Sequence, residues 1–150
     1  INFVNAKNTF QYEIKTIGNE FLGFVECENT PQGLIMQVRD TKGIIIGRIE
    51  GNQQNTKYTI KDRYNKTLGT VQRQGFLKQS YIIEDQENNQ TLQSKGDPTK
   101  REYKLVRNGE SLVTILKTSP ETYKIEIKNK IGSRIPILSL IIIDATQRKK

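Results

Sequence analysis

An internal repeat of about 22 residues is the feature that most constrains how this chain can fold. The third positions of four successive copies, Val38, Ile60, Ile83 and Leu105, are 22, 23 and 22 residues apart. A fixed short period indicates that one supersecondary unit is used several times, with neighbouring copies burying a common core. Shorter copies of the same pattern begin at Tyr12 and Tyr123.

Each copy is predicted to form one β-hairpin. Its first half, as in Tyr58–Asp62, alternates large apolar with polar residues, which is the period of a half-buried strand. Turn-forming residues then lead into a short apolar strand. The pair Asn108-Gly109 is the most specific of these turns, because both residues favour positive φ. The aspartates that end three first strands are expected to accept hydrogen bonds from the backbone of their own turns: Asp40, Asp62 and Asp85.

The alternation also assigns side chains to two faces, since successive residues of a strand point to opposite sides. The positions expected to point inward are Tyr58, Ile60, Tyr81, Ile83, Tyr103, Leu105, Tyr123, Ile125 and Ile127. The positions expected to point outward are Lys57, Lys61, Arg63, Lys104, Lys124 and Lys128.

Five to six hairpins in tandem predict an all-β chain of about twelve strands that follow one another as an antiparallel meander. A meander of this length twists, and closing it removes its exposed edges, so a closed β-barrel is the expected fold class. The strands are expected over about residues 1–128, and the 150 residues are expected to make one domain.

The end of the chain departs from the repeat. Ser133 can cap a helix and Pro136 is tolerated in its first turn, so a hydrophobic helix over about 134–147 is predicted. Three β-branched residues in a row, Ile141–Ile143, lower helix propensity and leave a buried strand as the alternative. A helix that is apolar on every side must be buried all round. The bore of a twelve-stranded barrel is too wide for its own side chains to fill, so it has room for such a helix.

The composition excludes several kinds of site. The chain has no His and one Cys, so it lacks the base of a Ser-His-Asp or Cys-His system and the ligands of a zinc or haem site. Cys27 has no partner for a disulfide and is expected to be a small core or rim residue. The segment Asp85–Asn89 resembles the start of a calcium loop but lacks that loop's Gly and its final carboxylate. No enzyme activity, catalytic residue, metal site or cofactor is therefore expected.

The chain is basic, with 24 Lys and Arg against 16 Asp and Glu and a net charge of +8. Cations at this density attract anionic lipid headgroups or nucleic-acid phosphates. The alternative is a solubilising face whose lysines protect the strands. The candidate anion-binding residues are Lys57, Lys61, Arg63, Lys104, Lys124 and Lys128, and the positive charge continues at Lys130, Arg134 and Arg148–Lys150.

Six segments follow one another in a characteristic order: Tyr58–Asp62, Leu68–Val71, Tyr81–Asp85, Tyr103–Ile115, Thr122–Ile127 and Ile137–Asp144. This order resembles the tubby C-terminal-like superfamily, and within it the LURP-one-related family, to which phospholipid scramblases are related. The resemblance covers nearly the whole chain and implies a twelve-stranded barrel wrapped round a hydrophobic C-terminal helix. Tubby members bind membrane phosphoinositides and scramblases are linked to lipid movement and calcium, so the functions of the family are diverse and the fold does not decide among them.

The expected function is a non-catalytic binding module that docks anionic phospholipid or phosphoinositide headgroups at its basic surface. The alternative is a structural or protein-interaction protein with no lipid role. Nucleic-acid binding is the weakest hypothesis, since the chain has no Trp and no basic helix.

The same sequence bears on where the protein acts. The most apolar run has nine residues, 135–143, against the roughly 20 that a membrane span needs. No signal peptide is recognised in Ile1–Phe10, which is polar. We therefore expect a cytoplasmic monomer, at most peripheral to the membrane, whose partner is an anionic lipid or a protein.

Overall fold

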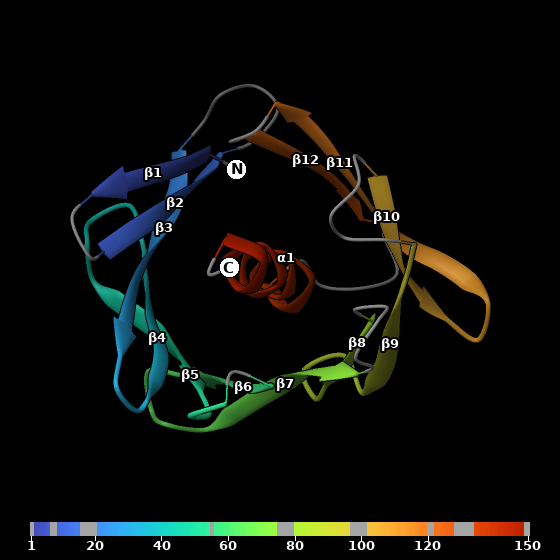
Figure 1. Cartoon of the computed structure of the whole chain (residues 1–150), viewed down its shortest axis with the longest axis horizontal. Helices are drawn as coiled ribbons and strands as arrows, with labels where there is room; N and C mark the ends of the chain where they lie inside the picture. Colours follow the sequence, from blue (N-terminus) through green and yellow to red (C-terminus); the bar gives the residue numbers. More distant parts are fainter. Residues whose placement is uncertain are drawn as a thin grey trace. The chain divides into compact units, whose positions relative to one another are not determined.

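Strands make up most of the chain that the structure describes (Figure 1). The computed structural model describes residues 2–6, 9–15, 21–54, 56–74, 80–96, 102–119, 122–127 and 134–148. These residues form twelve antiparallel strands and one helix, which confirms a mostly β chain that ends in a helix. The chain divides into two compact units, Ile1–Thr67 and Leu68–Lys150, here called unit 1 and unit 2.

Unit 1 is a six-stranded meander, in which each strand pairs antiparallel with the next along the chain. Consecutive turns of a meander lie at alternate ends of its sheet, because the chain reverses direction at each of them. The strands run from blue to green in Figure 1 and comprise β1 (Asn2–Ala6), β2 (Thr9–Lys15), β3 (Phe21–Thr30), β4 (Gly33–Arg39), β5 (Ile45–Gly51) and β6 (Lys57–Asp62).

Unit 2 repeats the same plan and adds the helix, drawn in red in Figure 1. Its strands again pair antiparallel in sequence order. The turn between the fourth and fifth of them has φ of 50° at Asn108 and 82° at Gly109, which confirms the predicted turn. The elements are β7 (Thr67–Gln74), β8 (Ser80–Asp85), β9 (Gln90–Lys95), β10 (Glu102–Arg107), β11 (Glu110–Ser119), β12 (Thr122–Ile127) and α1 (Arg134–Arg148).

The predicted alternation of faces is confirmed along the strands that carry the repeat. The inward set is buried from Tyr58 to Tyr123, whereas Ile125 and Ile127 at the end of β12 are only half-buried. Cys27 is also buried, as expected for a core residue. The buried members of the inward set are Tyr58, Ile60, Tyr81, Ile83, Tyr103, Leu105 and Tyr123.

The apolar C-terminal segment is a helix and not the alternative strand. α1 begins at Arg134, so Pro136 lies in its first turn, where the missing N–H removes no helical hydrogen bond. The β-branched residues of this helix, Ile141–Ile143, are buried, and so are its polar residues Ser139 and Asp144. Burial of many aliphatic side chains therefore outweighs the weak local helix propensity. The predicted cap, Ser133, lies outside the described residues.

Closure of the strands into a barrel, and a single domain over the whole chain, stay predictions. The described residues contain no helix that is both long enough and apolar enough to cross a bilayer; α1 has 15 residues.

Candidate functional site

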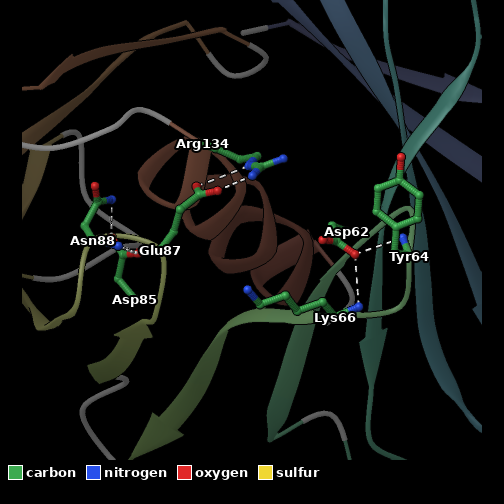
Figure 2. A network of polar contacts seen from close by, with 7 residues as sticks. All are labelled: Asp62, Tyr64, Lys66, Asp85, Glu87, Asn88 and Arg134. Atoms are coloured by element: carbon green, nitrogen blue, oxygen red, sulfur yellow. Dashed lines mark hydrogen bonds and ion pairs between the residues drawn. The ribbon is translucent and has the colours of Figure 1, made fainter.

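The aspartates at the ends of the first strands accept hydrogen bonds from the backbone of the turns that follow them. Oδ1 of Asp40 accepts hydrogen bonds from the backbone N–H groups of Lys42 (2.9 Å) and Ile44 (3.0 Å). Oδ1 of Asp62 accepts from Tyr64 and Lys66, both at 2.9 Å (Figure 2). These bonds confirm the predicted capping role.

Asp85 does the same in a buried setting. Its carboxylate accepts from the backbone N–H of Asn88 (2.9 Å), from the Asn88 side chain (2.7 Å) and from the Gln90 side chain (3.1 Å). The next acid, Glu87, forms an ion pair with Arg134, which fastens the start of α1 to the β8–β9 turn (Figure 2). The segment that resembles a calcium loop therefore serves as a turn and a helix anchor. The described residues contain no group of three His, Cys, Asp or Glu side chains that could hold a metal ion.

In unit 1, the predicted basic residues differ in their surroundings. Lys57 is exposed at the start of β6. Nζ of Lys61 lies 3.5 Å from a carboxylate oxygen of Glu50, and Arg48 contacts the same carboxylate at 2.9 Å, so the two cations share one counter-ion. The prediction that Arg63 lies on the same strand is wrong, because β6 ends at Asp62, whose carboxylate caps the turn that follows.

In unit 2, the predicted basic residues also differ, because only some of them have a carboxylate partner. Nζ of Lys124 lies 3.4 Å from Glu126 on the same strand, so this lysine has its own counter-ion. Lys104 is exposed on β10 and forms no ion pair with any described residue. Lys128 and Lys130 lie outside the described residues.

The strand register places Lys104 directly opposite a second lysine, Lys95 on β9. Both side chains are exposed on the same face, and Lys95 likewise forms no ion pair with a described residue. They border a hollow of about 520 Å³ on this face of unit 2. Its lining is Lys95, Gly96, Glu102, Tyr103, Lys104, Val106, Gly109 and Ser111.

A second hollow on the same face gives a useful contrast. It is smaller, about 130 Å³, and its charged side chains are Glu102, Lys124 and Glu126, with Thr114 and Leu116 between them. Two carboxylates against one paired lysine make it unsuited to an anion. Of the two hollows, the one beside Lys95 and Lys104 therefore has the positive balance that an anion needs.

Lys95 was missed in the sequence analysis, although a signal was present. Thr91, Gln93 and Lys95 alternate with the buried Leu92 and Ser94, so the period of two already assigned Lys95 to the outer face. What the sequence did not contain is the register that sets it opposite Lys104.

Unit 2 also contains a buried polar cluster. The hydroxyl of Tyr123 donates to the carboxylate of Asp144 on α1. Burial raises the pKa of the nearby Tyr103 phenol well above its ordinary value, and the charges of Tyr123, Asp144 and Tyr81 add to this effect. A phenol with so high a pKa stays protonated near neutral pH, so it does not supply a general base there.

No family model, no curated protein and no solved structure shows a significant match to this chain.

Proposed function

We propose that the chain is a non-catalytic module that docks the phosphate-bearing headgroups of an anionic membrane lipid, and that Lys95 and Lys104 form the contact. The observation that carries this proposal is the register of β9 and β10, which sets these two lysines directly opposite each other beside a hollow. A phosphate seated between them would be the shared counter-ion that the described residues do not provide.

The energetics of the pair support an anion as its partner. Like charges directly opposite on neighbouring strands are destabilising, by a few tenths to about 1 kcal/mol. Arg48 and Lys61 are also directly opposite each other, on β5 and β6, but there the carboxylate of Glu50 contacts both cations, at 2.9 and 3.5 Å. Each lysine near an anionic membrane surface adds roughly 1 kcal/mol of attraction. The hydroxyl of Ser111, in the same lining, offers a further donor to a phosphate oxygen.

The family and the finer fold belong to the same proposal. A tubby-like, LURP-one-related chain would close its strands into one barrel around α1. Support comes from the burial of α1 on nearly every side, from Ile135 to Thr146. A single unfolding transition, seen alike by near-UV and far-UV circular dichroism, is expected for one closed barrel. Two separate transitions would contradict closure.

The absence of catalysis is also proposed on chemical grounds. The chain has no His, and the described turn aspartates are committed to backbone caps. Among the residues that the structure describes, the phenol of Tyr103 is the one group whose pKa is strongly shifted, and the shift is away from neutral pH. A general base tuned near the working pH is what acid–base catalysis requires.

The test is flotation with vesicles across a panel of headgroups at two salt concentrations. The Debye length falls from about 30 Å at 0.01 M salt to about 8 Å at 0.15 M, so a diffuse attraction should largely disappear at the higher salt. Binding that persists at 0.15 M supports the headgroup site. Failure to bind any anionic vesicle at low salt would overturn the proposal and favour the protein-interaction alternative. Equal binding to all anionic surfaces, DNA included, would show that the net charge alone is sufficient.

A matched pair of variants localises the site. Lys104→Glu and Lys124→Glu make the same charge change on the same face of unit 2, but only Lys104 borders the larger hollow. Lys104→Glu should abolish the salt-resistant binding, whereas Lys124→Glu should leave most of it. Equal losses would show that overall charge, and not the pair, controls binding.

A further inference from the structure

Unit 1 exposes large apolar side chains that its fold does not use. Leu22 is 49% exposed, Ile44 53%, Ile45 41% and Tyr64 81%. Every exposed large apolar side chain found among the described residues belongs to unit 1. Single exposed aliphatic residues are ordinary on a protein surface, so their positions decide whether they mean anything.

These four residues lie at one end of the sheet of unit 1. Ile45 pairs with Arg39 at the end of β4, and Arg39 pairs in turn with Phe24 near the start of β3. Ile44 belongs to the β4–β5 turn, and Leu22 lies two residues before Phe24. The chain then returns to this end along β6, because Gly47 near the start of β5 pairs with Asp62. Tyr64 follows in the next turn. We call this set, Leu22, Ile44, Ile45 and Tyr64, the apolar turn end.

The turns are built so that these side chains stay outside. The carboxylates of Asp40 and Asp62 each hold two backbone N–H groups of their own turn. Figure 2 shows Asp62 bonded in this way to Tyr64 and Lys66. The turn after β6 also needs Asn65 at a positive φ of 67°. Fixed turns present Ile44 and Tyr64 to solvent and do not let them fold back onto the sheet.

Cations accompany the apolar side chains. Lys42, Arg63 and Lys66 are exposed in the same two turns, and none forms an ion pair with a described residue. The guanidinium of Arg63 lies 5.7 Å from the centroid of the Tyr64 ring. The two turn carboxylates, Asp40 and Asp62, are already occupied by backbone donors. The outer surface of both turns therefore offers apolar tips beside positive charge.

An anionic bilayer fits this chemistry better than a protein partner. The side chains protrude from two separate tight turns, and a fluid interface accepts protruding tips without a complementary cavity. Tyr is suited to the headgroup level, with its ring in apolar surroundings and its hydroxyl in water. Lys and Arg beside it match the negative surface charge.

We infer that the apolar turn end inserts into the interface of an anionic bilayer, with Ile44 and Tyr64 as the anchors and Lys42, Arg63 and Lys66 at the headgroups. The inference rests on the proposed function only for the nature of the occupant, since it concerns a different unit and different residues. Insertion adds an apolar component to binding that salt does not screen.

The chain has no Trp, so one substitution creates a site-specific reporter. Tyr64→Trp places an indole at the apolar turn end. Gln53→Trp is the matched control, because Gln53 is exposed in the β5–β6 turn, at the opposite end of the same sheet. With anionic vesicles, the emission of Tyr64→Trp should shift to the blue and be quenched by lipids with brominated acyl chains. The emission of Gln53→Trp should change little.

A second variant tests the anchor itself. Ile44→Asp should lower vesicle affinity roughly threefold to tenfold, by removing apolar burial, and the loss should remain at 0.15 M salt. Because Ile44 is exposed, circular dichroism should show an unchanged fold.

The outcomes separate this inference from the proposed function. An unshifted indole in Tyr64→Trp on vesicles that bind the protein would overturn insertion and leave the headgroup site standing. A full blue shift in the double variant Tyr64→Trp with Lys104→Glu, at undiminished affinity, would support insertion and overturn the site at Lys104. Absence of binding to every vesicle at either salt concentration would overturn both.

Discussion

The phenol of Tyr123 on β12 donates a hydrogen bond to the carboxylate of Asp144 on α1, and both residues are buried. A carboxylate removed from water needs hydrogen-bond donors, so this contact fixes one face of the helix against the last strand. The phenol of Tyr103 is buried nearby, yet its oxygen has no hydrogen-bond partner among the described residues. Two tyrosines at equivalent positions of the repeat therefore differ in what they contribute.

We expect loss of the hydroxyl to change the free energy of unfolding differently at the two tyrosines. Tyr123→Phe removes a donor from a buried carboxylate and should lower the free energy of unfolding by about 1–3 kcal/mol. Tyr103→Phe removes an unpartnered hydroxyl and should leave that energy unchanged or slightly raised. Urea unfolding followed by circular dichroism measures both. Equal losses in the two variants would contradict the assigned roles.

The raised pKa of Tyr103 predicts a weakness at alkaline pH. Burial holds its pKa above the ordinary value of 10.0, so above about pH 10 the unfolded chain releases a proton that the folded chain keeps. This contribution to stability is complete below pH 10 and is lost as the pH rises toward the folded-state pKa. Tyr103→Phe should make the alkaline fall in stability shallower, by up to about 1.4 kcal/mol per pH unit. Identical slopes with and without the phenol would contradict this.

The helix is expected to be a core element and not an appendage. Ile142 is fully buried, so Ile142→Ala should cost roughly 2–5 kcal/mol. Ile137 is only half-buried on the same helix, and Ile137→Ala should cost clearly less. Chemical denaturation of both variants gives the comparison. A negligible cost at Ile142 would show that α1 is not part of the core.

Calcium is expected to have no effect on stability. The carboxylate of Asp85 is held by three donors and Glu87 by Arg134, so neither is available as a ligand. Millimolar calcium should leave the melting temperature unchanged relative to sodium chloride at equal ionic strength. A saturable rise of several degrees would reveal a site, because a ligand of the folded state stabilises it by mass action.

More of the fold than of the candidate site could be predicted from the sequence, because the fold follows from local patterns whereas the site depends on contacts between strands. A period of two near Tyr58 or Tyr103 is a local property, so strands, faces and turn caps could be predicted. The helix could be predicted because Ile137–Ile143 is apolar on every side, although its β-branched residues favour a strand locally. The partners of Lys61 and Lys104 could not be predicted, because they depend on the register between strands.

Two details of the structure depend on strand register and turn hydrogen bonds and could not be predicted from the sequence. The ladder between β10 and β11 shifts between Leu105 and Val106, and no sequence pattern indicates such an irregularity. The capping bonds of Asp62 end β6 one residue before Arg63, which turns a predicted strand residue into a turn residue.

The central claim is that Lys95 and Lys104 are kept opposite each other for an anion, at some cost to stability. Lys104→Glu would replace a repulsive pair with an attractive one across β9 and β10, which should raise the free energy of unfolding by a few tenths to about 1 kcal/mol. The same variant should lose the salt-resistant binding of anionic vesicles.

The most direct test is therefore to measure the free energy of unfolding and the affinity for vesicles on the same preparation of each protein, the wild type and Lys104→Glu. Affinity is determined at 0.15 M salt, for vesicles of equal charge that carry either a polyphosphorylated inositol lipid or phosphatidylserine. We predict that the wild type prefers the inositol lipid and that Lys104→Glu is more stable but no longer binds it. A variant that binds as tightly as the wild type, or a wild type without preference between the two lipids, would contradict the account.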